Sequence, residues 1–212
     1  MKDHAMKLPL PLLPVIATLT PLLLLTACGA SSDDDQELEH QFSDNYSISD
    51  FSLSADTDYW EIRTAIPETP EDYSTNRQVD EAAFISLSPV QTDVLNATFS
   101  ESGFKTGCPN TCFNYVVSLS DDYATVISSY DELKAFFGNI DTDAELYIWL
   151  SESDYSLVVE PQSWEATATG YRAIITWDSL CAHRGTDLVD VTADGTITMV
   201  KRFEEKTDGS CF

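Results

Sequence analysis

Cysteines carry the most specific chemistry in this sequence, and four of its five cysteines lie in the second half: Cys108, Cys112, Cys181 and Cys211. Thiols form disulfides, bind zinc or act in redox catalysis, and the compartment decides among these. Together with His183, three of the four thiols could supply a Cys3His zinc site. The C-x-x-x-C spacing of Cys108 and Cys112 does not match the C-x-x-C of thioredoxin-like redox motifs.

The first thirty residues indicate which compartment applies. Lys2 and Lys7 begin a short basic region, and the following residues up to Thr26 are uncharged and dominated by leucine. Four prolines in this run argue against a membrane-spanning helix, because each interior proline removes a helix hydrogen bond. A basic start, an apolar middle and small residues at the end predict a secretory signal peptide over residues 1–27.

An exported chain meets an oxidising compartment, where an even number of cysteines favours disulfides over zinc or redox sites. Four cysteines permit three connectivities. Of these we favour Cys108–Cys112, which closes a short loop, and Cys181–Cys211, which fastens the C-terminal tail.

The end of the leader is more specific than an ordinary cleavage site. Leu25-Thr26-Ala27-Cys28 resembles the lipobox of bacterial lipoproteins. The resemblance implies diacylglyceryl transfer to the Cys28 sulfur, cleavage before Cys28, and anchoring to a membrane by the acyl chains. Gly29 follows the cysteine, a pattern that in Gram-negative lipoproteins suggests sorting to the outer membrane. The alternative is an ordinary signal peptide with a coincidental cysteine.

The charge of the chain limits its partners. The full sequence has 11 Lys and Arg against 36 Asp and Glu, which gives a net charge of −25. Removal of residues 1–27 takes away Lys2, Lys7 and Asp3, so the mature chain has 9 basic and 35 acidic residues and a net charge of −26 over 185 residues. This balance argues against nucleic-acid binding and favours basic protein partners, whose association slows as salt rises.

Composition divides the mature chain into two parts. Residues 28–50 are rich in Ser, Asp, Glu and Gln and include Asp33-Asp34-Asp35, so they predict a flexible acidic tether behind the lipidated cysteine. Residues 51–212 predict a single α+β domain, with an antiparallel sheet and two or three short helices.

The first half of this domain gives mixed signals. Residues 59–63 predict a strand, and residues 67–78, which contain Pro67 and Pro70, predict a loop. Residues 79–102 are ambiguous: Ser88-Pro89 is a typical helix start with Gly103 as a stop, but the run from Val94 to Phe99 also suits a strand.

The second half is clearer. Residues 113–120 alternate apolar and polar side chains and predict a strand, followed by a return strand over residues 123–130. Residues 131–138 predict a helix capped by Ser129 or Asp131 and ended by Gly138, and Thr142 with Glu145 predicts a capping box on the next helix. Four more strands are expected near residues 155–160, 171–177, 187–193 and 196–203, the last two joined by a turn at Ala193-Asp194-Gly195.

Catalytic motifs are sparse. His183 is the only histidine of the predicted domain, and no G-x-S-x-G, P-loop or H-E-x-x-H motif is present. Asp141, Asp143, Glu145 and Glu152 match four positions of a calcium loop, but Leu146 replaces its glycine, so capping and a solvated helix face explain them better. We therefore expect no catalytic residue, cofactor or metal.

Two functional hypotheses follow. The first is a non-enzymatic, membrane-anchored lipoprotein of the cell envelope that serves as a binding or structural module, with a basic protein as the possible partner. The alternative is a hydrolase of cell-wall or polysaccharide material that uses paired carboxylates near an aromatic cleft. The four tryptophans that such a cleft could use are more typical of core or sheet-packing residues.

Overall fold

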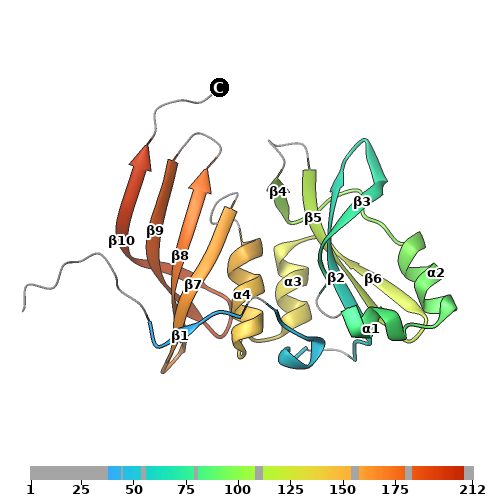
Figure 1. The fold of residues 1–212 in the computed structure, drawn as a ribbon, viewed down its shortest axis with the longest axis horizontal. Coiled ribbons are helices and arrows are strands. Elements are labelled where there is room, and N and C mark those ends of the chain that lie inside the picture. Colours follow the sequence, from blue (N-terminus) through green and yellow to red (C-terminus); the bar gives the residue numbers. More distant parts are fainter. Residues whose placement is uncertain are drawn as a thin grey trace, which may run out of the picture. The chain divides into compact units, whose positions relative to one another are not determined.

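Antiparallel strands make up most of the described chain, and they form two sheets (Figure 1). The computed structural model describes residues 38–43, 45–53, 56–78, 81–107, 112–153, 158–179 and 183–207. Gln36–Phe212 form one compact unit. The predicted signal peptide and Cys28 lie outside the described residues.

We call the first sheet the N-terminal sheet. Its strand order is β3-β2-β5, and β4 and β6 pair with opposite ends of the remaining edge of β5. The strands are β2 (Tyr59–Ile66), β3 (Thr69–Gln78), β4 (Lys105–Gly107), β5 (Cys112–Ser120) and β6 (Tyr123–Ile127).

The C-terminal sheet is an antiparallel meander that one short strand extends. Its order is β1-β7-β8-β9-β10, so β1 adds to the edge beside β7 and β10 forms the opposite edge. The strands are β1 (His40–Gln41), β7 (Val158–Thr167), β8 (Gly170–Ser179), β9 (His183–Thr192) and β10 (Ile197–Thr207).

Four α-helices and a short 3-10 helix, η1 (Ile48–Asp50), accompany these sheets in the described chain. The α-helices are α1 (Glu81–Ser86), α2 (Pro89–Ala97), α3 (Tyr130–Phe137) and α4 (Asp143–Glu152). Their start signals are confirmed: the Ser88 hydroxyl accepts from the Gln91 amide, Ser129 caps α3, and Thr142 with Glu145 forms the capping box of α4. Helix α2 ends at Ala97, before the predicted stop.

Two apolar clusters hold these layers together. The larger lies around α3 and α4 and joins Trp60 and Val116 of the N-terminal sheet to Ile175 and Val189 of the C-terminal sheet. The smaller lies on the other face of the N-terminal sheet, where Leu95 of α2 packs with Phe84, Tyr115 and Leu119. Both faces of the N-terminal sheet are therefore covered, one by α1 and α2 and the other by α3 and α4.

The α+β class with antiparallel strands is confirmed, but its details differ from the prediction. The chain builds two sheets instead of one, and four α-helices instead of two or three. Residues 69–78, predicted as a loop, form β3. This strand tolerates Pro70 because it lies at a sheet edge, where a missing backbone donor costs little.

The folded unit also begins earlier than the predicted boundary at residue 51. Backbone pairs join His40 to Trp164 and Gln41 to Ser163, and the side chains of Phe42, Tyr46 and Ile48 pack on the core. These few apolar side chains dock on a core that the rest of the chain supplies, so the polar composition around them does not prevent ordering. The part of the predicted tether from Leu38 onward thus belongs to the fold.

No helix among the described residues is long and apolar enough to cross a membrane.

Candidate functional site

Helices α1 and α2 leave large apolar side chains in solvent. Ile85 of α1 is 74% exposed, Val90 of α2 is 57% exposed, and Tyr123 at the start of β6 is 79% exposed. These helices and the link between them pack Phe84, Leu87, Val94 and Leu95 against the N-terminal sheet. Their inward residues therefore account for folding, whereas most of the surface of the three exposed side chains stays in solvent.

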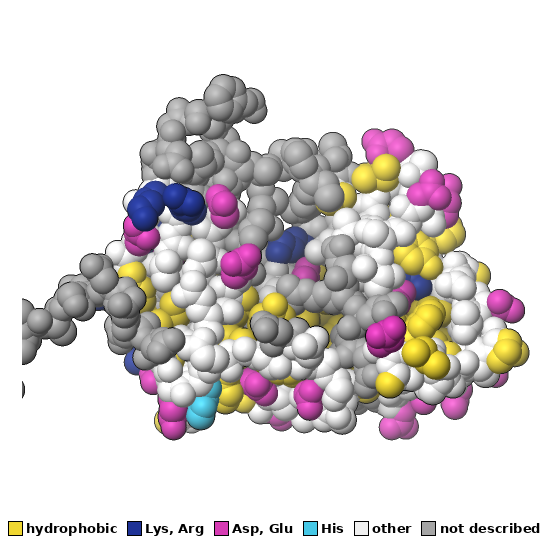
Figure 2. Space-filling model, in the orientation of Figure 1, with side chains coloured by type: hydrophobic (Ala, Val, Ile, Leu, Met, Phe, Trp, Pro, Cys, Tyr) yellow, Lys and Arg dark blue, Asp and Glu magenta, His cyan; other side chains and the backbone are white. Residues whose placement is uncertain are grey.

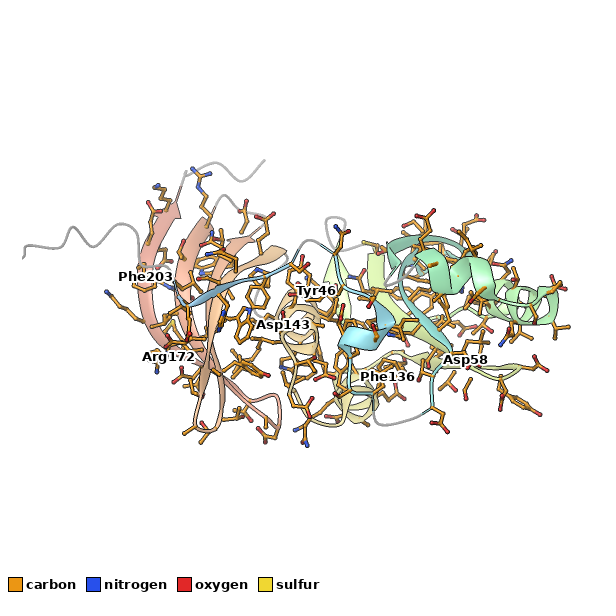
Figure 3. All side chains as sticks on the ribbon, turned by 60° about the horizontal axis from the view of Figure 1, so that its bottom comes forward. Tyr46, Asp58, Phe136, Asp143, Arg172 and Phe203 are labelled. Atoms are coloured by element: carbon orange, nitrogen blue, oxygen red, sulfur yellow. The ribbon has the colours of Figure 1, made fainter. Side chains whose placement is uncertain are left out.

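A hydrogen-bonded link holds the elements around these side chains together. The Asp58 carboxylate accepts from the backbone N–H of Asp121 at 2.7 Å and from the Gln91 side-chain amide at 3.5 Å. Gln91 also donates to the Asp121 carbonyl at 3.0 Å. The first turn of α2, the start of β2 and the β5–β6 turn thus lie side by side, and Figure 3 labels Asp58 at this junction.

Exposed carboxylates surround the apolar side chains. We define the α1–α2 face by its three apolar residues and five exposed acids: Ile85, Val90 and Tyr123, with Asp58, Glu81, Asp93, Asp121 and Asp122. Figure 2 shows hydrophobic and acidic side chains together on this side of the molecule.

The exposed charges described on this half of the molecule have one sign. Among the described side chains between residues 50 and 132, every exposed charged side chain is acidic, because Arg63 is buried and Lys105 is partly buried. The other described basic side chains belong to α3 and the C-terminal sheet, and four of them are exposed, Arg184, Lys201, Arg202 and Lys206, whereas Lys134 and Arg172 are partly buried. The net negative charge of the chain is therefore unevenly distributed.

Arg63 of β2 fixes α2 in place beneath this face. Its side chain is fully buried, and its Nε donates to Glu61 at 2.5 Å. Its two terminal nitrogens donate to the carbonyls of Leu95, at 3.0 Å, and Thr98. These carbonyls lie at the C-terminal end of α2, which carries partial negative charge, and the Leu95 carbonyl also accepts from the backbone N–H of Thr98. The arginine therefore caps the helix and ties it to the sheet.

Aromatic hydroxyls and rings close this buried cluster. Tyr59 donates to the second oxygen of Glu61 at 2.7 Å, and the Tyr73 ring lies 3.8 Å from the Arg63 guanidinium carbon. Burial raises the pKa of the Tyr115 hydroxyl, and the neighbouring Arg63 opposes that rise. Every charge is paired inside the protein, so the cluster is suited to holding α2 and not to reacting with a substrate.

A second set of ion pairs lies on the C-terminal sheet. Arg202 of β10 holds the buried Asp187 with two hydrogen bonds of 2.8 and 3.0 Å, and Arg172 of β8 holds Asp190 with bonds of 2.7 and 3.1 Å. The pKa of Arg202 is raised chiefly by its hydrogen bond to Asp187. Such bidentate pairs fix neighbouring strands in register.

The four carboxylates with calcium-loop spacing do not converge on one point. Glu145 accepts from the backbone N–H of Ser52 at 2.6 Å, and also from those of Asp141 and Thr142. Asp143 accepts from the Tyr46 hydroxyl at 3.3 Å, a pair labelled in Figure 3, and Glu152 accepts from Asn114 at 2.8 Å.

Capping is thus confirmed for Glu145, but the expected solvated helix face is wrong, since Glu145 and Glu152 are buried. Burial raises the pKa of the Glu145 carboxyl, although three backbone donors oppose that rise. No group of three His, Cys, Asp or Glu among the described residues could hold a metal ion.

Most residues of the predicted cysteine chemistry lie outside the described residues: Cys28, Cys108, Cys181 and Cys211. Cys112, at the start of β5, is disulfide-bonded. The pairings Cys108–Cys112 and Cys181–Cys211 and the lipidation of Cys28 stay predictions. His183 begins β9 by its backbone.

The tryptophans do not form an exposed platform. Trp60, Trp149 and Trp177 are buried in the larger cluster, and Trp164 is partly buried against it. The indole N–H of Trp149 donates to the Gly195 carbonyl at 2.8 Å, which fastens α4 to the β9–β10 turn. The expectation that most tryptophans pack in the core is confirmed.

Sequence reasoning missed the α1–α2 face because Ile85 and Val90 fall in the ambiguous segment 79–102 and Tyr123 begins a predicted strand. The available signal was Ile85 and Val90 beside a strong helix start, among acids and without basic residues. The chain matches no protein-family model, no curated protein and no solved structure.

Proposed function

We propose that this chain is a lipid-anchored binding module of the cell envelope, and that its α1–α2 face binds a basic protein. The observation that carries the proposal is the combination of exposed Ile85, Val90 and Tyr123 with exposed charges that, among the described side chains of this region, are all acidic. Apolar side chains left in solvent and rimmed by charges are typical of protein interaction surfaces.

Each component of this face has a separate role in binding. The apolar side chains supply the surface whose burial stabilises a complex, with a large aromatic ring at Tyr123. The carboxylates attract a partner of opposite charge and raise the association rate at low salt. Arg63 holds α2 from below, so the face is formed before the partner arrives.

Anchoring is the second part of the proposal, and it rests on the lipobox resemblance at Leu25-Thr26-Ala27-Cys28. Two or three acyl chains on Cys28 hold a protein stably at a membrane, and the preferred site is the outer membrane of a Gram-negative bacterium. Intact-mass analysis of the chain from its native host should show loss of residues 1–27 and added acyl mass. Cys28→Ser should abolish both changes; an uncut or unacylated wild-type chain refutes this part.

Partner binding is tested by titrating the full chain with lysozyme as a basic probe protein at rising salt. We expect binding that weakens as salt rises, because screening removes the charge attraction. Asp93→Lys combined with Asp122→Lys should weaken it about ten-fold or more. The matched control reverses two exposed acids of the C-terminal sheet side, Glu39→Lys and Glu160→Lys, and should change affinity much less.

The apolar residues are tested separately with Ile85→Ser and Tyr123→Ser, which leave the net charge unchanged. We expect each to weaken binding at high salt as well as at low salt, because apolar burial is not screened. If the charge reversals on the α1–α2 face and those on the control surface lower the affinity equally, the interaction is general charge attraction and not binding by this face. Absence of binding to basic proteins would remove the proposed partner class.

The carboxylate-dependent hydrolase stays an alternative without a specific observation in its favour.

A further inference from the structure

Strand β10 is a long edge strand. It runs for 11 residues, and among the described strands only β9 pairs with it. Figure 1 shows it at the outer edge of its sheet, and Figure 3 labels Phe203 on it. An edge strand carries a row of backbone donors and acceptors that can pair with another strand.

The central sequence of β10 is complementary to itself in charge. It reads Lys201-Arg202-Phe203-Glu204-Glu205, with two basic residues before the phenylalanine and two acidic residues after it. In an antiparallel pair of two copies related by a two-fold axis at Phe203, Lys201 lies opposite Glu205 of the second copy. Arg202 lies opposite Glu204 of that copy, and both contacts occur twice because the pairing is symmetric.

The contacts within one chain leave this arrangement available. Lys201 is exposed, its ammonium lies 4.6 Å from the centre of the Phe203 ring, and it forms no ion pair with a described residue. Arg202 binds Asp187 and Glu205, and Glu204 binds Lys206. Lys201 is therefore the cation of this run that lacks an acidic partner, and the two-fold pairing supplies one.

The charge distribution favours self-association at the β10 edge over the rest of the surface. A chain with a net charge of −25 repels its copies at most of its surface. Strands β9 and β10 carry four basic residues, Arg184, Lys201, Arg202 and Lys206, which offset the nearby acids. Repulsion between copies is therefore weakest where β10 lies.

We propose that two copies of this chain pair through antiparallel β10 strands centred on Phe203, so that the two C-terminal sheets join into one continuous sheet. Two β-bulges, between Met199 and Lys201 and between Arg202 and Glu204, interrupt the pairing of β10 with β9. Bulges increase strand twist, and the symmetric copy carries the same twist. This pairing is independent of the α1–α2 face, which lies on the other sheet.

Charge exchange tests the register of this dimer. Sedimentation equilibrium of the full chain in neutral detergent should show a dimer. Lys201→Glu alone and Glu205→Lys alone should each weaken it about ten-fold, because each turns two attractive cross-strand pairs into two repulsive ones. The double variant Lys201→Glu with Glu205→Lys should restore the dimer, and mixing the two single variants should give a heterodimer.

Cross-linking provides a readout that does not depend on charge. Residues opposite each other in antiparallel strands have Cα atoms about 4.5–5.5 Å apart, which is within disulfide range. Phe203→Cys should therefore form a covalent dimer under mild oxidation. The control Thr198→Cys lies five residues from the axis, about 34 Å from its copy at 3.4 Å per residue, and should not cross-link above the wild-type chain.

The outcomes separate clearly. A dimer that is lost in both single variants, is restored in the double variant and cross-links at residue 203 supports the pairing. A monomer at concentrations up to about 1 mM overturns it. A dimer that is equally stable in the charge variants and in wild type, or that cross-links equally at residues 198 and 203, also overturns it. In either case the copies meet through another surface.

Discussion

Removal of the buried arginine under α2 should destabilise the protein strongly. Arg63→Met deletes the only cation paired with the buried Glu61 among the described residues, and it deletes the donors to the carbonyls of Leu95 and Thr98. Methionine keeps much of the arginine stem, so the cavity left behind is small. The expected loss therefore comes from electrostatics and hydrogen bonding.

The magnitude follows from these contacts. Breaking a buried ion pair by removing one partner costs about 3–5 kcal/mol, because the other charge stays buried without compensation. A buried carbonyl left without a donor costs about 1–3 kcal/mol, but the Leu95 carbonyl keeps the backbone N–H of Thr98, so this cost applies at most to the Thr98 carbonyl and overlaps with the first. We expect a decrease of about 4 kcal/mol in the free energy of unfolding. The α1–α2 face should weaken as a binding surface in the same variant, since α2 loses its cap.

Urea unfolding followed by tryptophan fluorescence measures this loss, because Trp60 lies on the same strand as Arg63. With a slope of about 2 kcal/mol per M, the midpoint should fall by roughly 2 M. The matched control is Arg172→Met, whose ion pair with Asp190 is partly exposed and should cost about 1 kcal/mol or less.

A double-mutant cycle isolates the ion pair. Glu61→Gln in the Arg63→Met background removes the unpaired charge. The loss of unfolding free energy in the double variant should therefore be about 2 kcal/mol smaller than the sum of the losses in the two single variants. A loss below about 1 kcal/mol for Arg63→Met, or additivity within about 0.5 kcal/mol in the cycle, would refute the assignment of a buried, mutually dependent pair.

Two further predictions concern the turn and the helix cap. Gly195→Ala should lower the free energy of unfolding by about 1–3 kcal/mol in thermal or urea unfolding, because Gly195 has φ +79° and an added Cβ would lie 3.0 Å from the Trp149 ring; an unchanged stability would contradict the described packing. Hydrogen bonds from Ser128 and Ser129 lower the pKa of the Glu132 carboxyl below 4.5. The ionised carboxylate therefore contributes to the stability of the fold above pH 4.5, and this contribution is lost as the pH falls through the lowered pKa. Stability measured against pH should therefore decline less below pH 4.5 in Glu132→Gln than in wild type, and parallel curves would contradict this.

Local signals in the sequence predicted the elements that depend on local physics. The helix starts at Ser88, Ser129 and Thr142 follow from side-chain oxygens that accept the first free backbone N–H groups. The strand at residues 112–120 follows from alternation, and the turn before β10 from Asp194-Gly195. Each of these signals lies within a few residues of the structure that it specifies.

Features that depend on distant partners were not predictable in the same way. Tyr59, Glu61 and Arg63 share one face of β2, and charged residues on a strand usually indicate a solvated face. The register places Arg63 opposite Tyr115 and Glu61 opposite Val117, on the apolar face of β5 that α2 covers. Only knowledge of that pairing shows that the charged face of β2 must be buried.

The even-numbered face of β5 is a second case in which the burial of polar residues depends on distant partners. Its Asn114 and Ser118 suggest exposure, yet Ser118 is buried, and Asn114 bonds Thr64 on one side and Glu152 on the other. Polar residues here serve the contact with α4 and β2 instead of facing water. Likewise, the α1–α2 face required both helices to be placed before its exposed side chains could be identified.

The segment from Leu38 to Leu53 determines how mechanical force would enter the folded unit. It crosses from Trp164 of β7, through Tyr147 and Glu145 of α4, to Trp60 of β2. Under the proposed anchoring at Cys28, a pull exerted through a bound partner would transmit tension first to the two-residue strand β1. That strand can peel from β7 one backbone pair at a time, so the aromatic contacts behind it would be strained next, before the two sheets themselves carried load.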